Sequence, residues 1–344
     1  MQSGVDLSTH ISGYRVNQAL ERLWEIVEES PCPNRSGNCM TKPVPHTSPT
    51  FFRRVFYEAM EHRAVWRLCL FLILILPLLY GGNFAARQFL KGAGLAVLFF
   101  VREVRIFLTY LFATWVMGRI EGRSIAEYGL PWRPIFRSRF WEGALLGFLS
   151  LTGLIMMMRL LGVFHFGGVV LRGADIAKWA LLYVLVFVLV ALTEEFSARG
   201  YMLYTLSASI GFWPAAILTA VFFGYSHHGN AGEDWVGLFN AGFFGLLACL
   251  LLRRTGNLWM PIGLHMAWDW AETFFYGVAN SGKTYPGQLA NSSSSGPTWL
   301  SGGTVGPEGS VLCTLLMVLA WFLCSTWLPE VKYPKQIAAT EQTR

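Results

Sequence analysis

Two neighbouring carboxylates and a later arginine, Glu194, Glu195 and Arg199, stand at helical spacing in an apolar part of the chain. On a helix, Glu195 and Arg199 lie one turn apart with the acid first, which is the favourable order for an ion pair. Glu194 is turned about 100° away from Glu195. One carboxylate can therefore be neutralised while its neighbour faces a cavity as a general base. The alternative for this segment alone is a structural ion-pair cluster at a helix end.

Imidazoles stand in two further segments. His227 lies one helical turn after Phe223, so the phenyl ring can pack on the imidazole and limit its rotamers. The helix is expected to end near His227, and capping at an interface is the alternative role. His265 and Asp269 are also one turn apart, in the middle of an apolar run, where a hydrogen bond within one helix is the structural alternative. The coincidence of three such segments favours one shared site.

The composition explains why these groups are informative. Apolar residues make up 53% of the 344 residues and charged residues 14%, whereas a soluble domain carries about 25% charged residues. Ionisable groups at membrane depth are costly to keep and usually mark a pathway, a relay or a catalytic site. The chain is therefore expected to be a membrane-embedded catalyst.

The elements that must position these groups are apolar runs of membrane-spanning length. The sequence predicts an all-α fold, a polytopic membrane helix bundle with about eight transmembrane helices, over residues 65–80, 92–117, 143–164, 179–193, 212–226, 235–252, 258–276 and 311–328. Arg102, Glu103 and Arg105 interrupt the second run. They mark either an ion cluster facing the bundle or a break between a re-entrant piece and a span.

The formal net charge of +6 comes from bases beside the apolar runs, and these bases form no stripe that would suggest nucleic-acid binding. Counting crossings places four groups of bases on one side, which the positive-inside rule names cytoplasmic. They are residues 53–67, 119–139, 253–254 and 332–335. We therefore expect a multi-pass protein of the cell membrane with both termini in the cytoplasm. The Ser/Gly-rich loop at about 280–310 would then lie outside.

Three parts are expected along the chain. Residues 1–60 form a polar cytosolic segment with an amphipathic helix, 61–330 the membrane bundle, and 331–344 a cytosolic tail. No basic segment followed by an apolar one opens the chain, so no cleaved signal peptide is expected and the first span serves for insertion. Cys32 and Cys39 have neither zinc-binding nor redox C-x-x-C spacing.

A site of Glu194, His227, His265 and Asp269 allows two chemistries. All four side chains are suitable metal ligands. Alternatively, Glu194 and His227 activate a water without metal while donors stabilise the oxyanion of an attacked peptide carbonyl. The sequence has no H-E-x-x-H, no G-x-S-x-G and no Gly-Asp pair. This favours a glutamate-type hydrolase with neither metal nor cofactor.

The three motifs E-E-x-x-x-R, F-x-x-x-H and H-x-x-x-[ND] on successive helices resemble the CAAX protease and bacteriocin-processing family, whose eukaryotic branch is the type II CAAX prenyl endopeptidase. The resemblance spans about residues 179–276. It implies a catalytic core there, an eight-helix membrane fold, a conical cavity open to the cytosol, and metal-independent cleavage of a peptide bond. It implies roles for six residues: Glu194 as the base, His227 as its partner, His265 and Asp269 on the oxyanion side, and Glu195 with Arg199 as a supporting pair.

One position departs from that family. The prenyl endopeptidase branch is described with Asn at the last motif position, whereas an ionised Asp269 can only accept hydrogen bonds. Either Asp269 is protonated by its apolar setting, or it orients His265.

We therefore predict an intramembrane endopeptidase acting on a membrane-associated, prenylated or otherwise lipidated substrate. Its expected partners are the bilayer and a peptide or protein substrate delivered from membrane or cytosol. The alternatives are a non-catalytic adaptor or immunity protein and a proton-coupled transporter.

Overall fold

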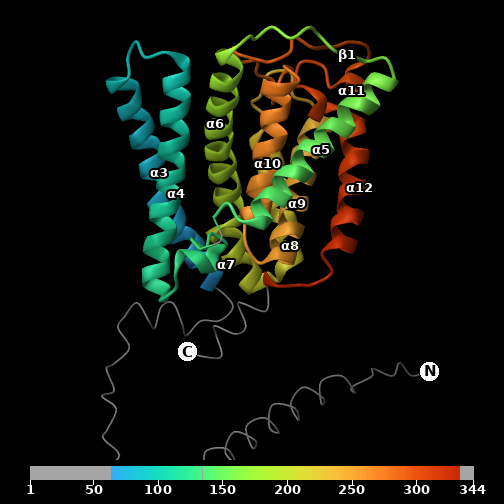
Figure 1. Cartoon of the computed structure of the whole chain (residues 1–344). Helices are drawn as coiled ribbons and strands as arrows, with labels where there is room; N and C mark the ends of the chain where they lie inside the picture. The colour runs from blue at the N-terminus through green and yellow to red at the C-terminus, as the bar shows by residue number, and fades with distance from the viewer. Residues whose placement is uncertain (1–62, 134, 334–344) are drawn as a thin grey trace, which may run out of the picture. The chain divides into compact units, whose positions relative to one another are not determined.

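The computed structural model describes residues 63–133 and 135–333. The predictions for residues 1–60, Cys32 and Cys39 included, and for most of the tail lie outside these residues. Figure 1 shows a bundle of helices: α3 (Arg63–Phe89), α4 (Leu95–Glu121), α5 (Ser138–Leu160), α6 (Ala174–Arg199), α7 (Tyr201–Ile210), α8 (Phe212–Ser226), α9 (Trp235–Thr255), α10 (Trp259–Trp270) and α12 (Val311–Trp327). The predicted all-α bundle is confirmed.

Short elements connect the helices. They are η1 (Ile125–Tyr128), the π-helical turn η2 (Ala271–Phe275), α11 (Thr298–Ser301), η3 (Pro307–Gly309) and the strands β1 (Phe164–His165) and β2 (Ser293–Ser294). The two strands pair antiparallel, with Phe164 opposite Ser294. This pairing ties the loop after α5 to the long connection between η2 and α12.

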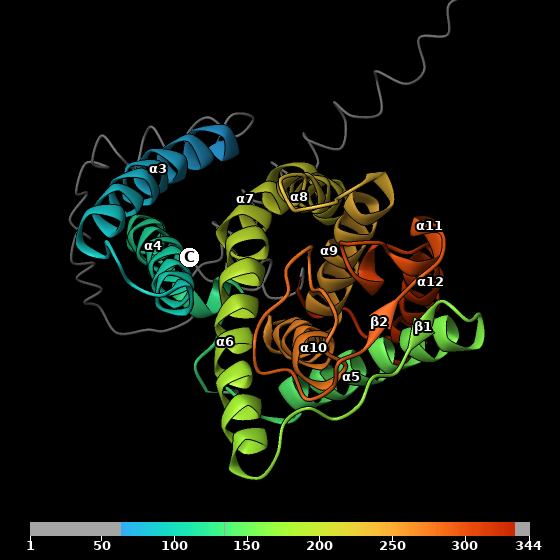
Figure 2. The same ribbon diagram turned by 90° about the horizontal axis from the view of Figure 1, so that it is seen from above.

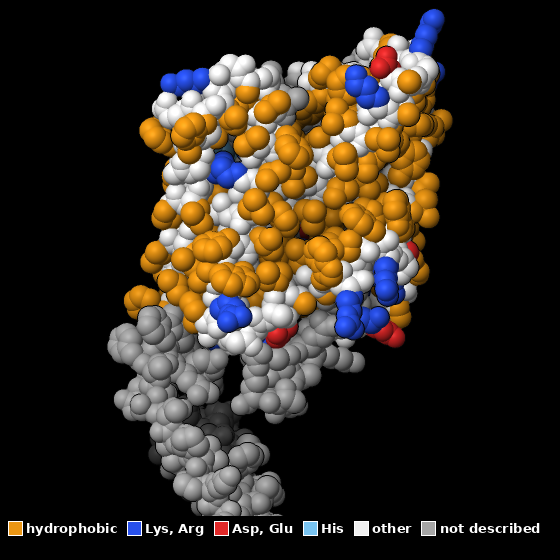
Figure 3. Space-filling model, turned by 60° about the vertical axis from the view of Figure 1, so that its left-hand side comes forward, with side chains coloured by type: hydrophobic (Ala, Val, Ile, Leu, Met, Phe, Trp, Pro, Cys, Tyr) orange, Lys and Arg blue, Asp and Glu red, His pale blue; other side chains and the backbone are white. Residues whose placement is uncertain are grey.

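Each of the eight apolar runs falls on a helix. Within residues 63–133 and 135–333, four segments can cross a bilayer by length and composition: Ala64–Phe89, Ser138–Leu160, Ala174–Ile210 and Trp235–Thr255. Shorter apolar helices occupy Phe212–Ser226 and Val311–Trp327. Apolar side chains form a broad band on the face formed largely by α3 and α4, and most of the Lys and Arg side chains visible there gather at its two ends (Figure 3). The protein is a membrane protein, while the number of eight crossings stays a prediction.

The interruption in the second run proves to be an ion cluster on a continuous helix. α4 runs unbroken from Leu95 to Glu121. Glu103 is buried and lies 3.5 Å from the Arg102 guanidinium. The Arg105 Nη1 donates a 2.9 Å hydrogen bond to the Leu79 carbonyl in α3. Arg105 therefore fastens α4 to α3, and no re-entrant break occurs here.

The two ends of the bundle can be told apart by their connections. Residues 200–211 and 256–258 lie at one end, and β1, α11 and the connection 276–310 lie at the other (Figure 1). The described members of the four base groups lie at the first end. The opposite end also carries Arg87, Lys91, Arg159, Arg172 and Lys178. The charge bias between the ends is therefore modest.

The closest helix packing is between α5 and α10, which lie side by side in Figures 1 and 2. A Cβ at Gly143 would lie 2.1 Å from the Met260 carbonyl oxygen, and a Cβ at Gly147 would lie 2.1 Å from that of Leu264. On α10, a Cβ at Gly263 would lie 2.0 Å from the Phe140 carbonyl oxygen. Small residues spaced four apart let helix backbones approach closely in membranes. This contact fixes the height and rotation of α10, which carries His265.

Adding one methyl group at the contact tests this packing. We expect Gly147→Ala to lower the free energy of unfolding by about 1–3 kcal/mol, because the new Cβ would overlap a backbone carbonyl. Gly153→Ala on the same helix is the matched control, since the nearest atom to its Cβ is a Leu316 methyl at 4.0 Å. Thermal unfolding of detergent-purified protein gives the comparison. Equal midpoints for the two variants would contradict the assigned contact.

Candidate active site

The two adjacent acids of α6 face different surroundings. The Glu195 carboxylate is fully buried, and its Oε2 lies 2.9 Å from the Arg199 Nη1. The Glu194 side chain retains 35% of its exposure and lines a cavity. The helical spacing of the sequence places them this way, because successive residues of a helix point about 100° apart.

Arg199 contacts two neighbouring helices inside the bundle. Its Nε donates to the Gly245 carbonyl of α9 at 3.3 Å, and its guanidinium lies 4.4 Å from the centre of the Phe223 ring of α8. α6 ends at this residue, and a Cβ at the following Gly200 would lie 2.5 Å from the Phe196 carbonyl oxygen. The arginine thus joins α6, α8 and α9 just where the helix terminates.

His265 links the two acids. Its Nδ1 lies 2.9 Å from the Glu195 Oε1, and its Nε2 lies 3.7 Å from Glu194 and 3.6 Å from Asp269. Because an ionised carboxylate can only accept hydrogen bonds, Nδ1 carries a proton and donates a hydrogen bond to Glu195. The Nε2 therefore faces the cavity between two carboxylates.

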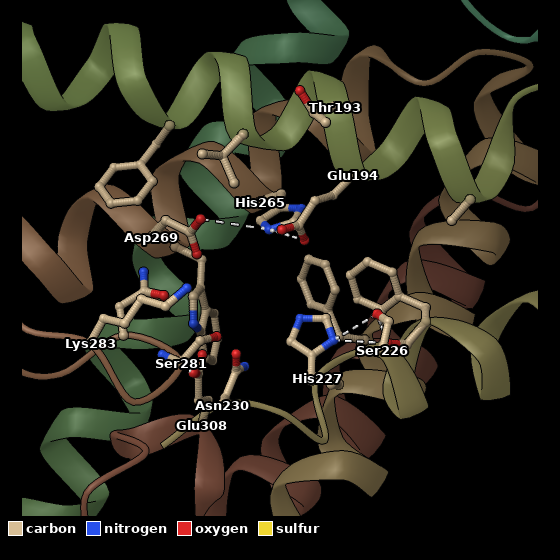
Figure 4. A pocket seen from close by; sticks show the side chains of 18 of the residues that line it. Thr193, Glu194, Ser226, His227, Asn230, His265, Asp269, Ser281, Lys283 and Glu308 are labelled. Carbon is tan, nitrogen blue, oxygen red and sulfur yellow. Dashed lines mark hydrogen bonds and ion pairs between the residues drawn. The ribbon is translucent and has the colours of Figure 1, made fainter. Parts of the chain in front are cut away.

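His227 lies at the end of α8 and lines the same cavity, opposite Glu194 in the view of Figure 4. Its ring centre is 4.8 Å from that of Phe223, as the spacing predicts. Its Nδ1 lies 2.8 Å from the Phe223 carbonyl oxygen, and a carbonyl can only accept. In the neutral imidazole, Nε2 is therefore left with its lone pair. The residue both caps the helix end and presents a base.

The cavity has a volume of about 440 Å³. Glu194, His227, His265 and Asp269 all line it, whereas Glu195 and Arg199 lie behind the wall. α6, α8 and α10 therefore bring together the six predicted site residues as four lining side chains and two supporting ones. Their chemical roles stay predictions.

The connection between η2 and α12 supplies lining residues that the sequence did not predict: Asn280, Ser281, Lys283, Tyr285, Val305 and Glu308. The Glu308 carboxylate accepts a short hydrogen bond from the Ser281 backbone N–H, and burial raises the pKa of the Glu308 carboxyl. Burial and the nearby Glu308 likewise raise the pKa of Glu233. No sequence signal was available, because this Ser/Gly-rich stretch has the composition of an ordinary surface loop.

This lining brings two predictions about sidedness into conflict. The cavity is bordered by the connection 276–310, which lies at the end opposite the four base groups, and no residue of 122–137, 200–211 or 256–258 lines it. The charge count places that end outside. The family resemblance implies a cavity open to the cytosol. Only one of the two can hold for this structure.

No group of three or more His, Cys, Asp or Glu residues within 63–133 and 135–333 is arranged to hold a metal ion. The described site instead pairs each imidazole with a carboxylate or a carbonyl. A metal would have to compete with these partners for the same atoms.

Comparison with known proteins supports the resemblance noted in the sequence. Residues 176–271 match the family model described as type II CAAX prenyl endopeptidase Rce1-like, which spans α6 to the first residue of η2. No curated protein and no solved structure matches the chain. At the level of the family, the match indicates an intramembrane protease of the CAAX type. It covers under a third of the chain but includes all six predicted site residues.

The buried ion pair behind the cavity can be tested by its stability. We expect Arg199→Leu to lower the free energy of unfolding by about 3–5 kcal/mol, because it leaves the Glu195 charge buried and unpaired by an arginine. Arg139→Leu is the control. It removes a 2.6 Å pair with Glu142 whose side chains are about one-third exposed, so it should cost under about 1 kcal/mol.

Thermal unfolding in detergent measures both variants. Adding Glu195→Gln to Arg199→Leu should recover part of the loss, since the uncompensated charge is then gone. Similar unfolding midpoints for Arg199→Leu and Arg139→Leu would show that the Glu195–Arg199 pair does not stabilise the fold more than an exposed pair does.

Proposed function

We propose that this chain is an intramembrane glutamate-type endopeptidase that hydrolyses a peptide bond of a membrane-associated substrate without a metal ion. The observation that carries the proposal is that the two adjacent acids have different surroundings. Glu195 is sequestered by Arg199 and His265, and Glu194 is left facing a cavity that also holds His227. A carboxylate that lies 3.7 Å from the His265 Nε2 and shares a cavity with a second imidazole has the composition of a general-base site.

The proposed reaction begins with a water between Glu194 and His227. Glu194 accepts a proton from this water while the oxygen bonds to the carbonyl carbon of the peptide, and the carbonyl electron pair moves to its oxygen. The resulting tetrahedral intermediate collapses with cleavage of the C–N bond. The proton held by Glu194 passes to the departing nitrogen, so one water is consumed and a carboxyl group and an amine are formed.

The walls of the cavity support a substrate with an apolar portion. Leu79 of α3, Phe99 and Ile106 of α4, and Phe222 of α8 line the cavity beside the charged residues. Phe222 is also 57% exposed on the surface of its helix, so the apolar wall continues to the face that contacts lipid. Such a wall suits a prenylated or otherwise lipidated peptide delivered laterally from the membrane.

Substitution of the base tests the proposal. With a lipidated peptide that the purified wild-type protein cleaves, Glu194→Gln and His227→Ala should each lower kcat by about 10²- to 10⁴-fold. The first change removes the group that accepts the proton, and the second removes the imidazole that holds the attacking water on its other side. His228→Ala is the matched control, because His228 is the exposed neighbour that stacks on Tyr225. It should retain wild-type turnover. Cleavage that stops after exhaustive chelation would contradict the metal-independent mechanism.

We also propose that both termini face the cytoplasm, as the base groups suggest. In a protein whose native cysteines have been replaced, a cysteine at the exposed Asp175, beside the cavity end, should react with an impermeant maleimide added to intact cells. A cysteine at the exposed Glu330 should react only after lysis. The reverse pattern would instead place the cavity end in the cytosol.

A further inference from the structure

The proposed hydrolysis leaves a negative charge on the substrate oxygen. The four predicted residues that line the cavity have few hydrogen-bond donors free to stabilise this charge. The His265 Nδ1 proton is committed to Glu195, and its Nε2 is shared between two carboxylates. Asp269, when ionised, only accepts. Stabilising an oxyanion requires N–H or O–H groups aimed at the position where the charge develops. The site therefore needs a donor from elsewhere.

Asn280 has the required chemistry and location. It follows η2 in the chain, lies outside the segment matched by the family model, and lines the cavity. The residue is 8% exposed, and within the described residues its Nδ2 has no hydrogen-bond partner of normal geometry. Its side chain interacts with the Asp269 carboxyl. A buried amide donor that makes no hydrogen bond of normal geometry is uncommon in folded proteins and calls for an explanation.

The backbone that carries Asn280 is fixed. Its N–H donates to the Lys283 carbonyl at 2.9 Å, and the Lys283 N–H donates back at 3.0 Å. Between them, the Gly282 N–H donates to the Val305 carbonyl at 2.8 Å, and Ser281 has a φ of 47°. A non-glycine residue in the left-handed region is costly and persists where the surroundings impose it.

The constraint on this turn comes from two other elements. The Glu308 carboxylate of η3 accepts the Ser281 N–H, and the Asn240 amide of α9 donates to the Glu308 and Ser310 carbonyls at 2.7 and 2.8 Å. At Gly306, where φ is 123°, a Cβ would lie 2.2 Å from the Ala279 carbonyl oxygen. The loop before α12 thus presses directly on the residue that precedes Asn280. Such support holds a side chain in place before substrate arrives.

We propose that Asn280 is a catalytic residue whose side-chain amide donates a hydrogen bond to the substrate oxyanion, in place of the donor that an ionised Asp269 cannot supply. An amide has two N–H groups. One can engage the Asp269 carboxylate, which orients the amide, while the other points to the substrate oxygen. This inference rests on the proposed function, because it assigns the oxyanion donor for that hydrolysis.

Kinetics of two variants test the assignment. Asn280→Leu keeps the approximate shape and removes both donors, and Asn280→Ala removes the side chain. Each should lower kcat by about 10²- to 10³-fold, the usual effect of losing one oxyanion donor, with KM changed by less than about threefold because the interaction forms only in the transition state. Asn291→Ala, at an exposed asparagine of the same connection that does not line the cavity, should keep kcat within about threefold of wild type.

Rescue separates a catalytic role from a structural one. Adding Asp269→Asn to Asn280→Ala restores an amide donor next to the same carbonyl oxygen, so kcat should recover by roughly tenfold or more through coupling of the two sites. A residue that only stabilised the fold would not be rescued in this way. Turnover is normalised to the folded fraction measured by thermal unfolding.

The outcomes distinguish the two proposals. Wild-type kcat in both Asn280 variants, with Glu194→Gln inactive, would overturn the assignment of Asn280 and leave the endopeptidase proposal standing. Losses that match the loss of folded protein, or that Asp269→Asn does not rescue, would also overturn it. Turnover that survives in Glu194→Gln would instead contradict the proposed general base itself.

Discussion

The burial of one carboxylate governs the arrangement of this site. Glu195 is fully buried in an apolar bundle, where an uncompensated charge would be prohibitive. It is tolerated because one oxygen is paired with Arg199 and the other accepts from His265. The contact with His265 requires α6 and α10 to meet at one height. The same contact orients the His265 ring and leaves its second nitrogen facing Glu194.

The packing of the other helices supports the contact between α6 and α10. Glycines of α5 allow α10 to pack against its backbone, which sets the level of His265. The break at Gly200 and the short helix α7 return the chain so that α8 can place Phe223 over the Arg199 guanidinium and His227 on the far wall. The π-helical turn η2 then leads into the connection that closes the cavity with Asn280 and Glu308. Catalytic geometry and helix packing are therefore not separable here.

The family match and the geometry cover different parts of the molecule. The matched segment holds the acids and imidazoles, and the unmatched connection holds a buried amide and a carboxyl that complete the cavity. Whether the cavity faces the cytosol or the outside depends on how the whole bundle is oriented in the membrane, and the charge bias between its two ends is modest. Different interactions therefore determine the chemistry of the site and the side from which substrate reaches it. The chemistry depends on the pairing of buried charges within the site, and the side depends on the uneven distribution of charged residues between the connections at the two ends.

Much of this protein was determined by the sequence itself. Helical periodicity predicted that Glu194 and Glu195 would face different surroundings and that Phe223 would pack on His227, because residues four apart share a helix face. Apolar composition predicted the helix bundle, since backbone groups in lipid must be satisfied within helices. Other features came only from the tertiary structure. The link from Glu195 to His265, the continuity of α4 through its charged residues, and the placement of Asn280 beside Asp269 all join residues far apart in the chain or depend on neighbouring helices. A linear pattern records the spacing within one helix, but contacts between helices depend on packing and buried charge across the whole fold.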